Sequence, residues 1–184
     1  MTDSTVHTVF QTDRGTLEFQ DYFVRLQCEP VVASIEFRGA GEAKPAPRFG
    51  ELLTDPSVDA FVICPSNPFI SIDPILAIPS VRTSLATHPS PVVAVSPVVD
   101  GQSIKGPTSK LMCELDLGSS AGDIAAYYSD FIDGFVVDHR DSNLAAQIDE
   151  TGIQTLCSNI VMSTFEDRCR LAREIVDFAA LMNK

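Results

Sequence analysis

The sequence predicts an α/β fold in which a parallel sheet carries helices on both faces. Three short apolar runs, each ending in polar or proline-containing residues, predict buried strands at 60–64, 92–96 and 134–138. Segments with helical periodicity or helix-start residues lie between these runs, and strands that alternate with helices favour parallel pairing with right-handed crossovers. The chain of 184 residues is long enough for one domain with its own core.

The first fifty residues add two further predicted strands and two helices. Apolar residues predict strands at 6–11 and 31–38. A helix is predicted at 18–26, because Phe19, Tyr22, Phe23 and Leu26 would then share one face. A loop rich in glycine, proline and charge follows, and then a short helix at 48–53.

The stretch after the first central strand, CPSNPFISIDPILAIP from Cys64 to Pro79, contains the first candidate site. Its prolines end the strand, and Asp73 is predicted as the N-cap of a helix with Pro74 at the first helical position. Ligands of open α/β sheets bind at the carboxyl ends of strands, and helix N-termini favour anions. Ser66 and Asn67 are therefore candidates to bind a phosphate or nucleotide; the alternative is that they only stabilise the local turn.

A second loop of the same kind follows the strand at 92–96. The pair Asp100-Gly101 predicts a small hairpin, and Lys105-Gly106-Pro107 precedes a predicted helix at 108–115. Lys105 and Gly106 are candidate phosphate contacts, with an ordinary surface lysine as the alternative reading of Lys105. Ser96 either faces the same cleft or simply ends its strand.

The C-terminal third continues the alternation of strands and helices. Ser119 or Ser120 is predicted to cap a helix that runs to about residue 131, and a further strand is predicted at 153–157. The last helix is predicted to start with a capping box formed by the sequence STFE at 163–166. Its apolar face, predicted to dock on the sheet, consists of Leu171, Ile175, Phe178 and Met182.

Composition narrows the classes of function. The formal net charge of -12 and the lack of a basic run argue against nucleic-acid binding, which needs clustered Lys and Arg. No apolar stretch approaches the roughly 20 residues that span a bilayer, and the first residues do not read as a signal peptide. The five cysteines form no CxxC pair, so reduced thiols and a cytoplasmic location are expected.

Several short motifs follow one another in a fixed order along nearly the whole chain. They are FQDYFV at 19–24, CPSNP at 64–68, SI at 71–72 with PIL at 74–76, AVSP at 94–97, KGP at 105–107 and DGFV at 133–136. In this order and spacing they resemble the 2-phospho-L-lactate transferases of coenzyme F(420) biosynthesis. The resemblance implies a Rossmann-like fold that is incomplete here. Nothing in the sequence matches the family's N-terminal GGTG-type loop or the aspartates that hold its metal.

The resemblance implies a single partial domain over residues 1–184 and a transferase function. A phospho-acid of the phospholactyl, phosphoenolpyruvyl or phosphoglyceryl type would move from a guanylylated donor to the deazaflavin Fo, releasing GMP. Ser66, Asn67, Ser96, Lys105 and Gly106 would hold the donor. The implied Mg²⁺ would be held by residues outside this sequence.

The absence of those family features predicts that the isolated chain is inactive. A complementary polypeptide with the N-terminal half would then be a partner, and an uncovered sheet edge would favour a homo-oligomer. The alternative reading is a non-catalytic module that binds a nucleotide or nucleotide-sugar, or one subunit of a split enzyme.

Overall fold

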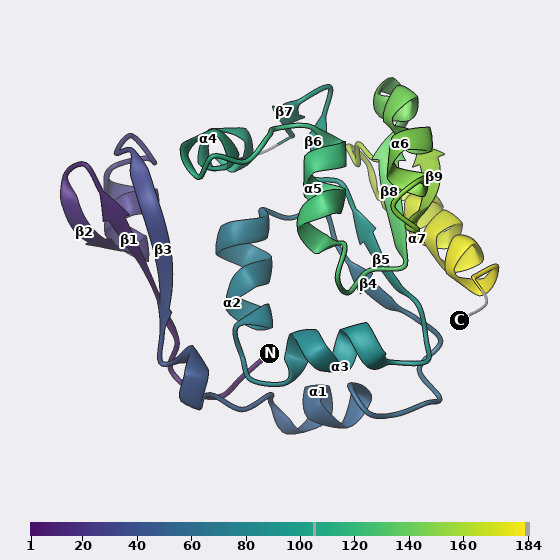
Figure 1. Ribbon diagram of the computed structural model, residues 1–184, viewed down its shortest axis with the longest axis horizontal. Helices are drawn as coiled ribbons and strands as arrows, with labels where there is room; N and C mark the ends of the chain where they lie inside the picture. The colour runs from purple at the N-terminus through teal and green to yellow at the C-terminus, as the bar shows by residue number, and fades with distance from the viewer. Residues whose placement is uncertain (105, 183–184) are drawn as a thin grey trace.

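The computed structural model describes residues 1–104 and 106–182, and its centre is a four-stranded parallel sheet (Figure 1). In spatial order the strands are β4 (Phe61–Ile63), β5 (Val92–Val95), β8 (Gly134–Asp138) and β9 (Gln154–Ser158). Each neighbouring pair is parallel. The predicted α/β class and all four predicted central strands are confirmed, and no strand end differs from its predicted position by more than one residue.

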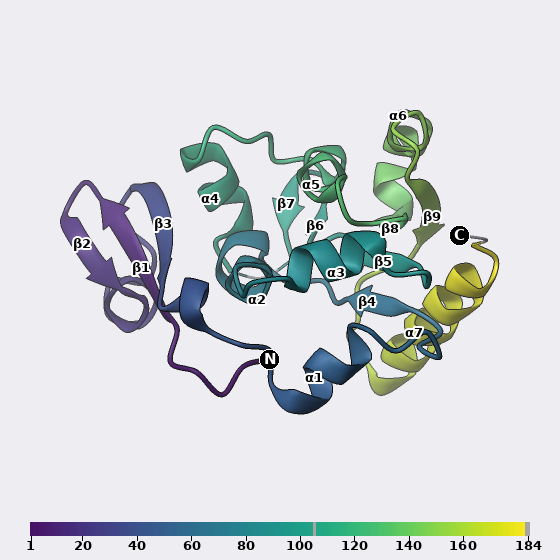
Figure 2. The ribbon, with the colours of Figure 1, turned by 60° about the horizontal axis from the view of Figure 1, so that its bottom comes forward.

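Helices cover both faces of this sheet (Figure 2). On one face, α7 (Phe165–Ala180) packs Leu171 and Ile175 against Val93 and Val136. Each such fully buried aliphatic side chain contributes roughly 1.5–3 kcal/mol of hydrophobic free energy. The predicted apolar face of the last helix therefore docks on the sheet as expected.

The opposite face of the sheet packs into a larger core. There α3 (Val81–Thr87) and α5 (Ala121–Tyr128) lie over alternate residues of the same strands, including Ala94 and Phe135. Smaller elements complete the chain: α1 (Pro47–Leu52), η2 (Ala40–Glu42), η4 (His139–Leu144) and α6 (Ala145–Asp149).

The strands predicted at 6–11 and 31–38 are confirmed, and with a third strand they form a separate antiparallel sheet, an arrangement that the sequence did not predict. Its order is β2 (Gly15–Glu18), β1 (His7–Thr12) and β3 (Val32–Arg38). A two-residue turn joins β1 to β2, and antiparallel strands are the ones that so short a connection can join. The helix predicted at 18–26 is present at 19–25, mostly as the π-helical turn η1 (Asp21–Arg25), and only Glu18 of the predicted range lies in β2 instead.

The helix α4 (Thr108–Glu114) links the two sheets (Figure 1). Lys110 Nζ donates to the Pro30 carbonyl at 2.8 Å, and Glu114 Oε2 accepts from the Val32 N–H at 3.1 Å. Lys110 and Glu114 also form an ion pair at 2.5 Å. Tyr22 from η1 is fully buried in the larger core, so both sheets share one hydrophobic interior.

Helix starts follow the predicted chemistry, although several helices begin at other residues than predicted, among them α1, which begins one residue early at Pro47. Ser120, one of two predicted caps, forms a capping box with Asp123 at the start of α5. At α7 the capping box uses Thr164 and Asp167, one residue later than predicted. The prediction of Asp73 as an N-cap is wrong. The helix Pro68–Leu76 (η3, Pro68–Ile72, continued by α2, Asp73–Leu76) starts six residues earlier, with Asn67 as its cap.

The predicted hairpin at Asp100-Gly101 is present as β6 (Val98–Val99) and β7 (Gln102–Ser103). Asp100 and Gly101 both have positive φ, 51° and 68°, as a tight two-residue turn of this hand requires. The Asp141 carboxylate, which is buried, accepts from the Asp100 N–H at 3.0 and 3.1 Å and holds this turn in place.

Within the described residues, no single helix is both long and apolar enough to cross a bilayer. One pair of helices, Pro68–Leu76 and Val81–Thr87, meets the length and composition criteria only when taken together, and the pair is bent by 85°.

Asp73 lies inside the helix as a partly buried hydrogen-bond acceptor. Tyr127 Oη donates to Asp73 Oδ2 at 2.6 Å. Burial raises the pKa of Asp73 to about 6, and the Tyr127 hydrogen bond and the Arg82 charge offset only part of this rise. The folded state therefore binds a proton here more tightly than the unfolded chain does.

This raised pKa predicts a pH-dependent effect on stability. The contribution of Asp73 is full below its ordinary value of 3.8 and is lost as pH rises through about 6. Asp73→Asn keeps an acceptor for Tyr127 and removes the buried charge. The variant should therefore be more stable than wild type at pH 8 by about 1–3 kcal/mol, and much closer to it at pH 4.5.

Urea unfolding at both pH values measures this difference, with Asp3→Asn in the exposed N-terminal segment as the matched control. A stability difference between Asp73→Asn and wild type that is the same at both pH values would contradict the assignment.

Candidate functional site

A hollow of about 180 Å³ opens where the central strands reach their carboxyl ends. Its lining comes from the loop after β4, from Pro97 after β5, from the start of α4 and from the segment after β9. The residues are Pro65, Ser66, Asn67, Pro97, Ile104, Thr108, Ile160 and Met162. Ligand sites typically measure about 300–1,000 Å³. The hollow therefore has room for a phosphate-sized group and not for a whole nucleotide.

The Asn67 side chain connects two of the segments that line this hollow. Its Oδ1 accepts from the N–H groups of Phe69 and Ile70 at 3.0 and 3.2 Å, which caps the helix Pro68–Leu76. Its Nδ2 donates to Thr108 Oγ1 at 3.1 Å and so ties the β4 loop to α4. Pro68 has no N–H, so these bonds leave few donors for an anion at this helix start. The side chain thus performs the turn role that the sequence left open.

The two candidate serines have different surroundings. Ser66 lines the hollow. Ser96 is fully buried, and its hydroxyl donates to the Val98 carbonyl at 2.8 Å and accepts from the Val98 N–H at 3.2 Å. In this structure the Ser96 hydroxyl stabilises the turn at the end of β5 and does not line the hollow.

The second predicted loop ends at the start of α4. Gly106 is exposed and has a φ of +70°, a left-handed conformation that a side chain would strain. Nothing lies within 4 Å of where its Cβ would be, so the glycine serves backbone conformation and not close packing. Lys105 lies outside the described residues. Thr108, at the first position of α4, is almost fully buried and faces Asn67.

Ionic contacts hold the third wall of the hollow, the segment after β9. Asp138 at the end of β8 accepts from Arg140 Nε at 2.7 Å and from the Ile160 N–H at 3.3 Å. Burial acts to raise the pKa of Asp138, but these hydrogen bonds outweigh it and the pKa is lowered. Arg170 on α7 donates to the Asn159 carbonyl at 2.5 Å. The carboxylate is therefore engaged in positioning Ile160.

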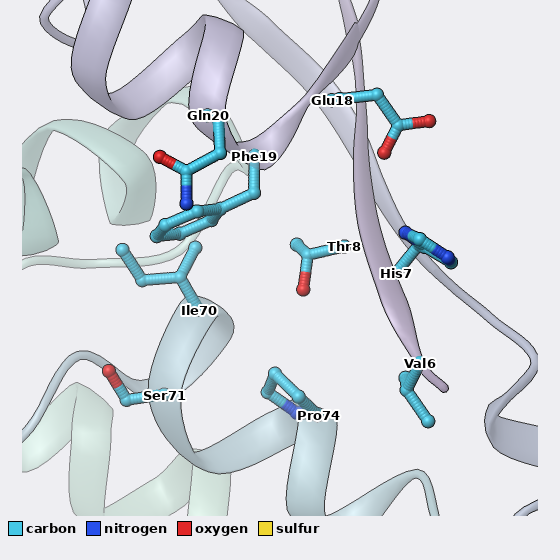
Figure 3. A pocket seen from close by; sticks show the side chains of 9 residues that line it. All are labelled: Val6, His7, Thr8, Glu18, Phe19, Gln20, Ile70, Ser71 and Pro74. Carbon is cyan, nitrogen blue, oxygen red and sulfur yellow. The ribbon is translucent and has the colours of Figure 1, made fainter. Parts of the chain in front are cut away.

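A larger hollow of about 410 Å³ lies between the antiparallel sheet and the helix Pro68–Leu76 (Figure 3). Phe19 and Ile70 border it with apolar surface, and Pro74 closes one side. Figure 3 shows the Thr8 hydroxyl pointing toward the space between Ile70 and Pro74. The remaining lining is polar or peripheral: Val6, His7, Glu18, Gln20 and Ser71.

The two hollows share one helix. Asn67 caps it at the smaller hollow, and Ile70 and Ser71 border the larger one within the next turn. Several lining residues of the larger hollow, Phe19, Gln20, Ser71 and Pro74, belong to the motifs that carry the family resemblance.

The described residues do not fit a magnesium ion. No three His, Cys, Asp or Glu side chains among them form a group that could hold a metal. Asp138 and Asp141, the buried carboxylates near the carboxyl ends of the strands, are already engaged by hydrogen bonds from backbone N–H groups.

Sequence reasoning missed several residues of the smaller hollow. Thr108 directly follows the KGP motif at a helix start, and this position could have identified it as a site residue. Ile160 and Met162 follow β9 without a motif, and only the sheet order brings them beside Ser66.

The two roles of Asn67 predict a measurable loss of stability on truncation. Asn67→Ala removes the cap and the bond to Thr108, and should lower the free energy of unfolding by about 1–3 kcal/mol. Asn67→Asp retains the two accepted bonds and should cost less. In a double-mutant cycle with Thr108→Val, we expect a coupling of about 0.5–1.5 kcal/mol.

Urea unfolding measures these free energies, and Asn143→Ala on the exposed surface is the matched control. If Asn67→Ala and Asn143→Ala cost the same, the assignment of Asn67 is wrong.

Comparison with known proteins supports the reading of these motifs. The sequence model of the family "2-phospho-L-lactate transferase CofD" matches residues 1–166. The chain is 34% identical over 180 residues to the 2-phospho-L-lactate transferase of Methanococcoides burtonii, covering 98% of this chain and 58% of that protein. It is 33% identical over 176 residues to the phosphoenolpyruvate transferase of Kitasatospora aureofaciens, covering 94% and 54%.

A solved structure of a Bacillus halodurans protein has the same fold, with a TM-score of 0.63 and 12% identity. That match covers 95% of this chain and 60% of the other. The chain thus spans little more than half the length of the relatives it matches. The family match over residues 1–166, with the motif-bearing loops gathered beside one helix, shows that the chain belongs to the CofD family of 2-phospho-L-lactate transferases.

Proposed function

We propose that this chain forms the donor-phosphate part of a transferase that moves a phospho-acid from a guanylylated donor to Fo. The acceptor hydroxyl of Fo attacks the phosphorus that carries the acid, and the bond from this phosphorus to GMP breaks. The hydroxyl proton leaves to solvent or to a base outside the assigned residues. Family membership supports the reaction class. The relatives named for phospho-L-lactate and for phosphoenolpyruvate are about equally similar to this chain. We therefore propose only that the transferred group is a 2-phospho-acid.

The observation that carries this proposal is the position of the smaller hollow. It lies at the carboxyl ends of parallel strands, where α/β sheets bind phosphorylated ligands, and the Ser66 loop and the start of α4 both line it. Ser66 supplies a hydroxyl donor to a phosphate oxygen. Asn67 holds the loop rigid through its three hydrogen bonds. Lys105 and Gly106 precede α4 in the sequence, and we assign the Lys105 charge and the left-handed backbone of Gly106 to the donor phosphates as well.

The larger hollow is where we place the acceptor ring. Its volume of about 410 Å³ falls within the range of small-molecule sites. Phe19 offers an aromatic surface to a planar ring, and Gln20 and Thr8 offer polar groups at its rim. The hollow borders the same helix that starts at the donor hollow, so both substrates would lie along one rigid element.

A second candidate function is a non-catalytic nucleotide-binding module. The observation that favours it is the lack, among the described residues, of a metal-holding group. A transferase and a binding module would both bind nucleotide, so only a measurement of turnover distinguishes them.

Nucleotide affinity tests the donor site. Lys105→Ala should weaken binding of GMP or GDP by roughly 1–3 kcal/mol, the range for a lost charged hydrogen bond. Calorimetry on wild type, Lys105→Ala and the matched control Lys44→Ala measures the change. Equal affinities for all three proteins would show that Lys105 does not contribute to nucleotide binding.

Turnover tests the transferase. The chain alone should form no deazaflavin product from Fo and a guanylylated donor. A chimera in which this chain replaces the matched part of the Methanococcoides burtonii enzyme should form it, because the remainder of that enzyme supplies what these residues lack. Phe19→Leu in the chimera should raise the KM for Fo more than the KM for the donor.

Turnover by the chain alone would show that the catalytic groups have been misplaced. A folded chimera that binds GMP without turnover would favour the binding module.

A further inference from the structure

The side chain of Arg168 lies beside the donor hollow. Arg168 belongs to the first turn of α7 and lines a separate hollow of about 270 Å³ together with Pro65 and Met162. The same two residues line the donor hollow. The two hollows therefore adjoin at Pro65 and Met162. Met162 is 36% exposed, so this border lies at the surface, where a ligand in the donor hollow can reach across it.

The described lining of the donor hollow carries no formal charge. It consists of prolines, aliphatic side chains, Met162 and the polar residues Ser66, Asn67 and Thr108. A guanylylated phospho-acid brings negative charge from its phosphates and from its carboxylate, and the whole chain already has a formal net charge of -12. Anions that leave bulk water need a paired cation. Because Lys105 is assigned to the phosphates, the carboxylate calls for a second cation.

Two arginines near the carboxyl ends of the strands are already engaged by the protein. Arg140 Nε donates to Asp138 Oδ1 at 2.7 Å. Arg170 Nη1 donates to both Glu174 carboxylate oxygens at 3.0 Å, and its Nη2 donates to the Asn159 carbonyl at 2.5 Å. A ligand would have to compete with these carboxylates for either guanidinium.

Arg168, in contrast, has no hydrogen bond or ion pair with any residue that the structure describes. The carboxylate next to it in the sequence does not neutralise it. Asp167 Oδ2 accepts from the N–H groups of Ser163 and Thr164 at 3.0 and 2.8 Å and belongs to the capping box of α7. Arg168 is also exposed, and its guanidinium is thus available to a ligand.

The surroundings of Arg168 suit a carboxylate. Its other neighbours in the hollow, among them Cys64, Leu171 and Ala172, are apolar. An arginine stem packs along such a surface while its guanidinium stays accessible, and the planar guanidinium donates two parallel hydrogen bonds to a carboxylate. Because water is partly excluded beside an apolar surface, such an ion pair is stronger here than one between two fully hydrated charges.

We propose that Arg168 binds the carboxylate of the transferred phospho-acid and so selects this class of donor over phosphate esters without a carboxylate. Relatives are named for 2-phospho-L-lactate and for phosphoenolpyruvate, and both compounds carry a carboxylate on the carbon that bears the phosphate. With the phosphate at Ser66, the carboxylate lies across Met162 at Arg168. No bond forms or breaks at Arg168, which is a binding and specificity residue. The inference rests on the proposed function, because it assigns one more contact to the same donor.

Calorimetry with two small phosphate esters tests this assignment in the full chain and in the chimera described above. Phosphoenolpyruvate carries the carboxylate, whereas isopropyl phosphate has the same carbon skeleton with a methyl group in its place. Arg168→Gln should weaken binding of phosphoenolpyruvate about tenfold, and should change the binding of isopropyl phosphate and of GMP by less than about twofold. Arg168→Lys keeps the charge without the planar fork, and should weaken phosphoenolpyruvate binding about threefold.

The matched control is Arg173→Gln, at an exposed arginine farther along α7 that lines neither hollow. This variant should bind both esters as wild type does. Urea unfolding of all variants should match wild type, since both arginines are exposed. In the chimera, Arg168→Gln should raise the KM for the guanylylated donor about tenfold and leave the KM for Fo unchanged, a difference that a general loss of folded protein would not produce.

Equal weakening of both esters by Arg168→Gln would overturn the assignment, because it would show a general effect of charge. Unchanged phosphoenolpyruvate binding would overturn it as well, and turnover by the variant chimera with an unaltered donor KM would leave the proposed function standing without Arg168. Conversely, phosphoenolpyruvate binding that depends on Arg168 in a chimera without turnover would support the carboxylate site and count against the transferase. If the wild-type chain and the chimera bind neither ester, the donor site and this inference are both wrong.

Discussion

The side-chain amide of Asn67 is the constraint on which the candidate site depends. One oxygen caps the helix Pro68–Leu76, and one N–H group binds Thr108 at the start of α4. The loop after β4, the helix beside both hollows and the helix that links the two sheets are thereby fixed by a single residue. Because α4 is in turn held to β3 through Lys110 and Glu114, this network extends from the central sheet to the antiparallel one.

Local pattern was enough to predict the central sheet and its helices. The strand β8 and the apolar face of α7 were predicted because buried parallel strands and docked helices have periodic sequences. Asn67-Pro68 and Asp73-Pro74 are both good helix starts by local chemistry. The choice between them is tertiary, because Tyr127 from α5 binds Asp73 inside the helix. At α7 the observed capping box of Thr164 and Asp167 is shifted by one residue from the predicted box.

The rest of the candidate site could not be predicted from the sequence. Ile160 and Met162 reach Ser66 only through the strand order, and strand order depends on contacts between distant segments. Local periodicity likewise does not indicate that β1 pairs antiparallel with β3. Ser96 illustrates the opposite case. Its place at a strand end was predicted, but the direction of its hydroxyl toward Val98 depends on the turn that follows.

The helix Pro68–Leu76 has a consequence beyond its contacts, because it borders both hollows. Under the proposed function, a ligand in either hollow that shifts this helix would change the shape of the other hollow, and the two binding free energies would then be thermodynamically linked. Linkage is reciprocal, and each ligand therefore alters the affinity of the other by the same factor. The buried carboxyl of Asp73 sits within this helix and changes charge near pH 6. Under the proposed function, a shift of this helix that alters the burial of Asp73 would couple proton uptake to the same linkage.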